Sequence, residues 1–109
     1  PVITQLKHID SIHICYVNLL PYYGKTILKN TMTSTYQEYV KIGATSGTQV
    51  ISFDHYPIVK EQVREEWYEN LEIIRKESLR TGMPFWGFVL STPHINYPQP
   101  NIASLRLKN

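Results

Sequence analysis

The chain has 109 residues, of which 42% are hydrophobic and 12% aromatic, so it can build a core and is not a mainly disordered protein. Eleven Lys and Arg against nine Asp and Glu leave a formal charge of +2, and their interspersed signs give little support for a nucleic-acid partner. The single cysteine excludes an intrachain disulfide, and no apolar run approaches the roughly 20 residues of a membrane span.

The first expected element is a buried strand at residues 12–19 (IHICYVNL). Its β-branched, aromatic and apolar residues form a nearly continuous run, which is typical of a strand inside a parallel sheet with both faces covered. Residues 5–10 before it are expected to form the end of a helix or a loop. Residues 20–33 after it form a long polar connection, and connections of about 12–15 residues are usually functional or mobile.

A helix is expected to begin at Thr35. Thr35 and Glu38 fit a capping box, in which the Thr hydroxyl accepts from the Glu amide and the Glu carboxylate reaches back. Gly43 is the expected end of this helix. The residues that share its apolar face are Tyr36, Tyr39 and Val40.

Two more strands are expected, at residues 49–53 (QVISF) and 84–90 (PFWGFVL). Pro57 closes the first of them, because proline cannot continue a central ladder. The second is followed by a loop at 91–100, rich in Pro, His, Asn and Tyr, and then by the start of another helix at 101–109.

Between those two strands, residues 60–81 carry the clearest helical period of the sequence. Glu72 and Lys76 are spaced to pair on its charged face, and Gly82 is a suitable residue just past its end. The apolar residues at helical spacing are Val63, Trp67, Leu71, Ile74 and Leu79.

This order of elements predicts an α/β fold with three parallel strands and helices packed against them. No repeat or linker-like segment divides the chain, so residues 1–109 are expected to form one unit. In parallel α/β folds the functional residues lie at the C-terminal ends of the strands, where the loops converge. The polar and aromatic side chains that we expect to bind a ligand there are Asn18, Asp54, His55, Tyr56, Trp86 and His94.

Aromatic rings together with carboxylate, imidazole and amide groups suit a sugar, because rings stack on its C–H faces and polar groups pair with its hydroxyls. Asp54 is the only acid expected at the C-terminal end of a strand, and it is our candidate site carboxylate. In an alternative interpretation it accepts loop amides and shapes the turn before Pro57. Glycoside hydrolysis ordinarily uses two carboxyl groups, about 5–5.5 Å apart in retaining enzymes and about 6.5–9.5 Å apart in inverting ones. The sequence offers one candidate for such a carboxyl group, Asp54.

Other chemistries have weaker support. Cys15 lies among apolar residues, as a buried structural thiol does, and His13 is expected to be a satisfied histidine of the sheet. His55 and His94 could meet at neighbouring strand ends, but two histidines without a third ligand do not make a zinc site. No P-loop, G-x-G-x-x-G or G-x-S-x-G motif is present, and we expect neither a metal nor an organic cofactor.

Five segments carry a family resemblance: 16–21 (YVNLLP), 51–58 (ISFDHYPI), 70–75 (NLEIIR), 84–89 (PFWGFV) and 100–106 (PNIASLR). Together they resemble part of a bacterial glycoside hydrolase, of the β-galactosidase-like TIM-barrel enzymes in the large retaining clan. The resemblance covers roughly strands five to seven. It implies a partial (β/α)₈ barrel, a carbohydrate substrate, and a periplasmic or extracellular location.

In that clan the acid/base usually comes from the end of the fourth strand and the nucleophile from the end of the seventh. The first would lie before Pro1, and residues 90–92 (LST) hold no glutamate where the second is expected. The resemblance therefore implies a sugar cleft without an identified catalytic pair. In this cleft we expect Asp54 and His55 to bind hydroxyl groups of the substrate, and Tyr56, Trp86 and His94 to form the stacking or rim surface, unless Trp86 belongs to the barrel core.

A (β/α)₈ barrel needs about 250 residues, so we expect this chain to be a fragment that is inactive alone. Its sheet edges at 12–19 and 84–90 are expected to need the rest of the barrel or a second copy of the chain. The alternatives are a non-catalytic carbohydrate-binding or protein-interaction α/β domain, and a small doubly wound domain of unrelated function.

Overall fold

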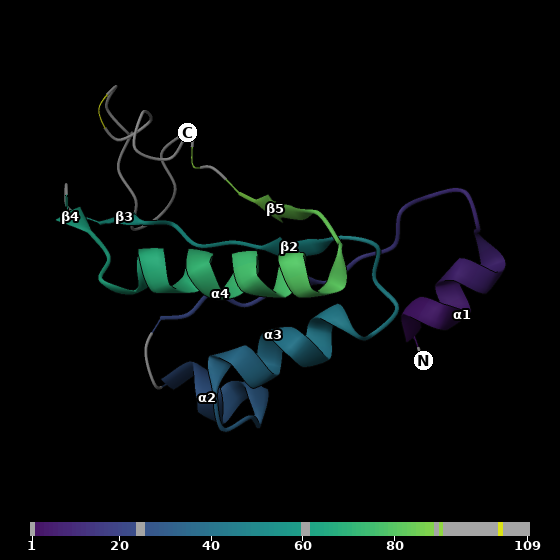
Figure 1. Cartoon of the computed structure of the whole chain (residues 1–109), viewed down its shortest axis with the longest axis horizontal. Coiled ribbons are helices and arrows are strands. Elements are labelled where there is room, and N and C mark those ends of the chain that lie inside the picture. Colours follow the sequence, from purple (N-terminus) through teal and green to yellow (C-terminus); the bar gives the residue numbers. More distant parts are fainter. Residues whose placement is uncertain (1, 24–25, 60–61, 89, 91–102, 104–109) are drawn as a thin grey trace.

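The chain is a mixed α/β structure, and a computed structural model describes its residues 2–23, 26–59, 62–88, 90 and 103 (Figure 1). The strands β1, β2 and β5 form one sheet, and β3 and β4 form a separate antiparallel hairpin. None of the described helices is long and apolar enough to cross a membrane. In chain order the elements are α1 (Val2–Ile9), β1 (Asn18–Leu19), α2 (Thr26–Thr31), α3 (Tyr36–Ala44), β2 (Ile51–Phe53), β3 (Ile58–Val59), β4 (Gln62–Val63), α4 (Glu66–Thr81) and β5 (Phe85–Gly87).

The three-stranded sheet is parallel throughout, which confirms the prediction from the order of the elements. Its strands lie in the order β1, β2, β5, which is also their order along the chain. The register places Asn18 beside Ser52 and Ser52 beside Trp86. Since paired residues of neighbouring strands project to the same side of a sheet, these three side chains form one row across it.

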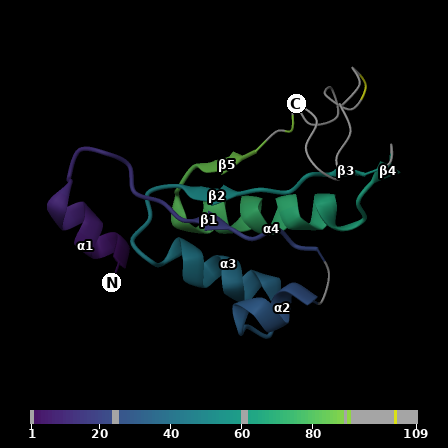
Figure 2. The ribbon, with the colours of Figure 1, turned by 180° about the vertical axis from the view of Figure 1, so that it is seen from behind.

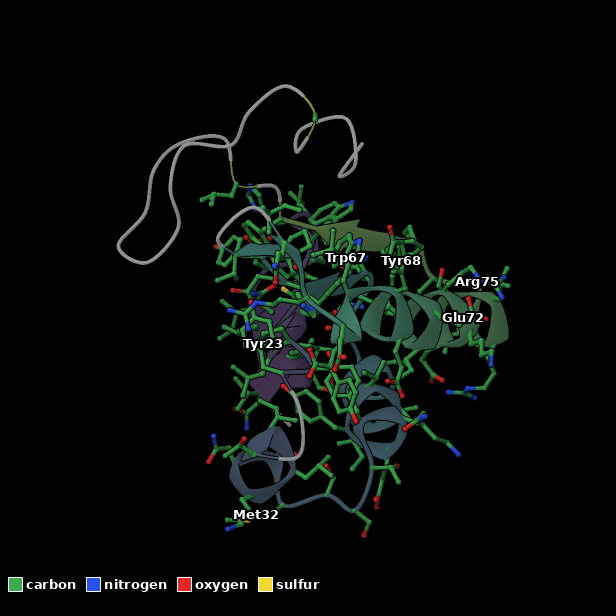
Figure 3. All side chains as sticks on the ribbon, turned by 90° about the vertical axis from the view of Figure 1, so that its left-hand side faces the viewer. Tyr23, Met32, Trp67, Tyr68, Glu72 and Arg75 are labelled. Atoms are coloured by element: carbon green, nitrogen blue, oxygen red, sulfur yellow. The ribbon has the colours of Figure 1, made fainter. Side chains whose placement is uncertain are left out.

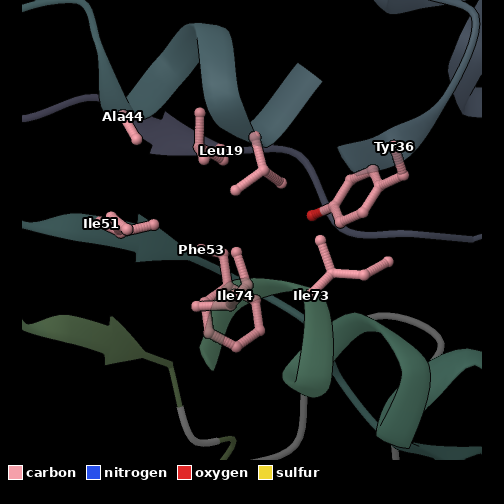
Figure 4. Packing of buried hydrophobic residues seen from close by; sticks show 8 residues of the cluster. Leu19, Tyr36, Ala44, Ile51, Phe53, Ile73 and Ile74 are labelled. Atoms are coloured by element: carbon pink, nitrogen blue, oxygen red, sulfur yellow. The ribbon is translucent and has the colours of Figure 1, made fainter. Parts of the chain in front are cut away.

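The hydrophobic core lies on the opposite face of the sheet. Leu19, Ile51 and Phe53 pack there with side chains of both α3 and α4 (Figure 4). The residues from these helices are Tyr36, Val40, Ala44, Ile73 and Ile74. Both helices therefore cover a single face, and seen from behind the strands lie in front of α4 (Figure 2). The expectation that the first strand is covered on both faces is not met in β1, where Leu19 is buried and Asn18 is exposed, whereas all three residues of β2 are buried.

The first strand is much shorter than the predicted 12–19, because only Asn18 and Leu19 pair along β2. A turn precedes it, in which the Asp10 carboxylate accepts the N–H groups of Ile12 and His13 at 3.0 and 3.1 Å. His13 is exposed and pairs with Asp10, so it is not the satisfied sheet histidine that we expected. Cys15 is partly buried, also outside the strand.

The long helix begins at Glu66 instead of residue 60, because the hairpin β3–β4 occupies the start of the predicted range. The hairpin is closed by the Arg64 N–H, which donates to the Pro57 carbonyl at 2.7 Å. Val63 is therefore an exposed strand residue, and Leu79 is 70% exposed, so neither belongs to the core. The left-handed Gly82 (φ 72°) ends α4 as predicted.

The capping box at α3 is confirmed. The Thr35 hydroxyl accepts the Glu38 N–H at 3.1 Å, and the Glu38 carboxylate accepts the Ser34 N–H at 3.0 Å. Gly43 does not end the helix, which runs to Ala44. Instead, the missing side chain of Gly43 lets α3 pack closely against Leu19, since a Cβ at this position would lie 2.6 Å from Leu19 Cδ2.

The structure differs from two further predictions. The connection predicted for residues 20–33 contains the short helix α2. The strand predicted for 84–90 is limited to β5, whose three residues are exposed. Apart from Ala103, the loop expected at 91–100 and the helix expected at 101–109 lie outside the described residues.

The packing of α4 leads to a test with two substitutions on the same helix. Ile74→Ala removes a fully buried side chain and should lower the free energy of unfolding by about 2–5 kcal/mol. Leu79→Ala removes an exposed one and should change it by no more than about 0.5 kcal/mol. Urea unfolding followed by circular dichroism measures both. Equal losses in the two variants would contradict the assignment of the buried face.

Candidate functional site

Two of the predicted site residues meet at the C-terminal edge of the parallel sheet. Asn18 lies in β1 and Asp54 directly follows β2. The Asn18 Nδ2 donates to Asp54 Oδ1 at 3.1 Å, and the Ser52 hydroxyl donates to Asn18 Oδ1 at 2.8 Å. These two hydrogen bonds fix the orientation of the Asn18 amide. They join a carboxylate and an amide side chain at the surface, where both can pair with the hydroxyl groups of a ligand.

Trp86 extends this site across the helix-free face, by which we mean the face of the sheet opposite the described helices α3 and α4. It shares a row with Ser52 and Asn18, two strands away from Asn18, which corresponds to about 9–10 Å of strand spacing. Its indole is 45% exposed and contacts the edge of the Tyr16 ring, with 5.5 Å between the ring centroids. The face thus presents a partly exposed aromatic surface beside a hydrogen-bonded polar pair.

His55 behaves differently from its neighbour Asp54, because its side chain is only 1% exposed. Its Nδ1 lies 2.7 Å from the Asn70 Oδ1. An amide oxygen can only accept, so Nδ1 must carry the proton and donate it. The same oxygen accepts the Tyr22 N–H at 2.8 Å, and Asn70 Nδ2 donates to the Tyr36 hydroxyl at 3.1 Å. That hydroxyl donates in turn to the Leu20 carbonyl at 2.7 Å.

The other nitrogen of His55, Nε2, is buried and has no hydrogen-bond partner among the described residues. The ring is enclosed by aromatic side chains, with its centroid 4.7 Å from that of Tyr23 and 5.3 Å from that of Trp67 (both labelled in Figure 3). Burial lowers the pKa of His55 below its ordinary value of 6.5, against the opposing effect of the hydrogen bond to Asn70. Burial likewise raises the pKa of the Tyr36 hydroxyl.

Tyr56 is held mainly through its backbone. Its N–H donates to the Tyr23 hydroxyl at 3.0 Å, and its carbonyl accepts from Arg64 Nε at 3.1 Å. The Arg64 guanidinium also lies 4.0 Å from the centre of the Tyr23 ring, in a cation–π geometry. The segment after β2 is therefore tied to the segment after β1 and to the residue that closes the hairpin.

The predicted residues thus fall into three groups. Asn18, Asp54 and Trp86 lie at or near the helix-free face, whereas His55 and the backbone of Tyr56 belong to the supporting structure behind it. His94 lies outside the described residues. Among the residues that are described, no three His, Cys, Asp or Glu side chains are grouped to hold a metal ion.

Sequence reasoning missed the buried amide of Asn70. This residue shares the inward face of α4 with Ile73 and Ile74, which follow it at helical spacing. A polar side chain at a position that the helical period places in the core is the signal that could have revealed it. Its partners Tyr22 and Tyr36 carry no such signal, because they reach it from distant parts of the chain.

The chain matches no protein-family model, no curated protein and no solved structure in comparisons with each. The resemblance to glycoside hydrolases therefore stays a prediction from short segments.

The buried amide leads to a stability test. Asn70→Leu keeps a similar volume but leaves the His55 Nδ1–H and the Tyr22 N–H without their acceptor, so the free energy of unfolding should fall by about 2–4 kcal/mol. Asn30→Leu is the matched control, because Asn30 is exposed on α2. Chemical denaturation of both variants measures the difference. A loss in Asn70→Leu no larger than in the control would show that the amide does not hold these segments together.

Proposed function

We propose that the chain is part of the catalytic domain of a glycoside hydrolase acting on oligo- or polysaccharides, and that it contributes sugar-binding residues. The observation that carries the proposal is the hydrogen-bonded pair of Asn18 and Asp54 on the same side of the sheet edge as Trp86. The carboxylate accepts sugar hydroxyls, the amide supports it, and the indole offers a face for the C–H groups of a pyranose ring.

The topology of the sheet supports a partial (β/α)₈ barrel as the fold behind this function. In the described residues the strand order follows the chain order, and both packed helices lie on one face. A doubly wound sheet reverses its strand order and carries helices on both faces. A barrel keeps its helices outside, and its active site forms where the strands end. In such a barrel the row of Asn18, Ser52 and Trp86 lies on the inner side.

The chain contributes to binding and does not complete the catalytic pair. Asp54 is the described carboxylate that joins the polar pair at the strand ends, and hydrolysis needs two carboxyl groups on either side of the scissile bond. The second group, and with it the turnover, belongs to the remaining units of the barrel. These units are also the proposed partner of the sheet edges. We extend the proposal to a periplasmic or extracellular location, as in the enzymes that the sequence resembles.

A non-catalytic carbohydrate-binding domain is the second candidate. The lone carboxylate of the site favours it, since such a domain needs a polar pair and an aromatic surface but no acid–base couple. The two candidates share the sugar-binding residues. They differ in whether carboxylates of further barrel units face Asp54 in the complete protein.

Sugar binding can be tested on the 109-residue chain with lactose as the first probe of a panel of mono- and oligosaccharides. Trp86→Ala should weaken binding by about fivefold, because an aromatic contact contributes about 1 kcal/mol. Tyr68→Ala is the matched control, since Tyr68 is an exposed aromatic residue of α4. Titration calorimetry measures the affinities. Absence of binding to every member of the panel would contradict the proposed function.

Turnover is tested separately. The chain should release no nitrophenol from para-nitrophenyl β-galactoside, because one carboxylate cannot act as both nucleophile and acid at the same bond. Turnover that disappears in Asp54→Asn would show that a second catalytic carboxylate is present in this chain. Asp10→Asn is the control, because Asp10 lies before β1 and pairs with His13.

A further inference from the structure

Four segments of the chain meet at one buried group of side chains. We define the His55 cluster as His55, Asn70, Tyr22 and Tyr36, which come from the segment after β2, from α4, from the segment after β1 and from α3. Asn70 bonds to all three of the others, through the imidazole of His55, the backbone N–H of Tyr22 and the hydroxyl of Tyr36. The cluster therefore fixes the two segments that follow the parallel strands relative to both helices.

The direction of each hydrogen bond in the cluster is determined. Asn70 Oδ1 accepts twice and Nδ2 donates to a hydroxyl that itself donates to the Leu20 carbonyl. A flipped amide would place its NH₂ against the Tyr22 N–H, which can only donate, so this backbone group fixes the orientation of the amide and makes His55 Nδ1 the donor. His55 is thus held as the neutral tautomer protonated on Nδ1, with a lone pair on the buried Nε2.

We infer that Asn70 and His55 are positioning residues for the proposed sugar-binding edge, and that protonation of His55 on Nε2 loosens the link between the segments after β1 and β2. The inference rests on the proposed function for its consequence, but the cluster itself can be tested without any sugar. Asp54 directly precedes His55, and Asn18 lies four residues before Tyr22. A displacement of the two tied segments therefore changes the geometry of the Asn18–Asp54 pair.

A proton on Nε2 is unfavourable in this place because it adds a charge and a donor where no acceptor is present among the described residues. Burial is the main cause, and the guanidinium of Arg64 also opposes the charge. The carboxylates of Glu66 and Asp54 act in the opposite direction. The Tyr36 hydroxyl that faces the cluster is neutral near pH 7, because burial raises its pKa above the ordinary value.

The sign of the pH effect follows from these contributions. The pKa of His55 is lower in the folded state than in the unfolded state, so the unfolded state binds more protons once the pH falls below about 6.5. Stability and the fixed geometry of the edge are therefore fully present near neutral pH. They are lost as the pH falls from about 6.5 through the folded-state pKa of His55.

Nuclear magnetic resonance of the wild-type chain tests the cluster directly. The ¹⁵N shifts of His55 should report the Nδ1–H tautomer at neutral pH, and acidification should shift the amides of Tyr22 and Asp54 with the same midpoint as the imidazole. The variant His8→Ala, which removes an exposed imidazole from α1, should leave that midpoint unchanged. An Nε2–H tautomer, or a titration of His55 that leaves both amides unmoved, overturns the inference whether or not the chain binds sugar.

Asn70→Asp gives the matched change of charge at nearly constant shape. A carboxylate beside Nδ1 should raise the pKa of His55 by at least about 1 unit, because an opposite charge favours the imidazolium. The midpoint of the Tyr22 and Asp54 amide shifts should move upward with it. An unchanged midpoint in a folded Asn70→Asp variant would show that Asn70 does not control His55.

Sugar binding supplies the readout that links the cluster to the site. With lactose, or with the tightest ligand of the panel, affinity should fall at least about fivefold between about pH 7.5 and about pH 5. His55→Leu should remove most of this pH dependence. A pH-independent affinity in the wild type would overturn the positioning role, whereas absence of binding at every pH would contradict the proposed function and leave the resonance experiment to judge the cluster.

Discussion

The buried amide of Asn70 makes three of the hydrogen bonds that hold the strand ends in place, beside the bond from the Tyr56 N–H to the Tyr23 hydroxyl. Asn70 brings three hydrogen bonds to partners that lie 15, 34 and 48 residues away in the sequence. No backbone ladder joins the segments after β1 and β2, since the parallel pairing ends at Leu19 and Phe53. Beyond the end of the sheet, the side chain of Asn70 therefore joins the two segments by hydrogen bonds. These bonds also hold the segments that carry Asn18 and Asp54.

The one-sided packing of the sheet is the second constraint. The apolar residues of β1 and β2 alternate with polar ones, so Leu19 and Phe53 enter the core while Asn18 and Ser52 face the other way. In this row Asn18 and Trp86 are exposed to water or to a polar ligand, whereas Ser52 between them is fully buried and supports the Asn18 amide. Trp86 is the exception in this row, and a large exposed ring among polar neighbours is the feature that an apolar sugar face can cover.

Sequence reasoning recovered what is encoded locally. The capping box of α3, the left-handed glycine after α4 and the parallel α/β order all depend on residues a few positions apart, and the structure shows them. It did not recover the hairpin β3–β4, whose closure depends on the Arg64 N–H reaching back to Pro57. It also placed His55 with the ligand-binding residues, because the sequence shows its strand-end position but not the amide that draws it inward. The resemblance to a glycoside hydrolase adds expectations of function that short segments alone cannot test.

Asp54 and His55 are adjacent in the sequence and yet serve opposite sides of the structure. One carboxylate belongs to the surface pair, and the next side chain is enclosed by Tyr23, Trp67 and Asn70. Any coupling between the two sites is reciprocal by thermodynamic necessity. If a proton on His55 weakens the binding of a ligand at Asp54, then the bound ligand must lower the proton affinity of His55 by the same factor. Under the proposed function, the titration of an imidazole that does not touch the ligand therefore reports ligand binding, and the ligand affinity reports the charge of that imidazole.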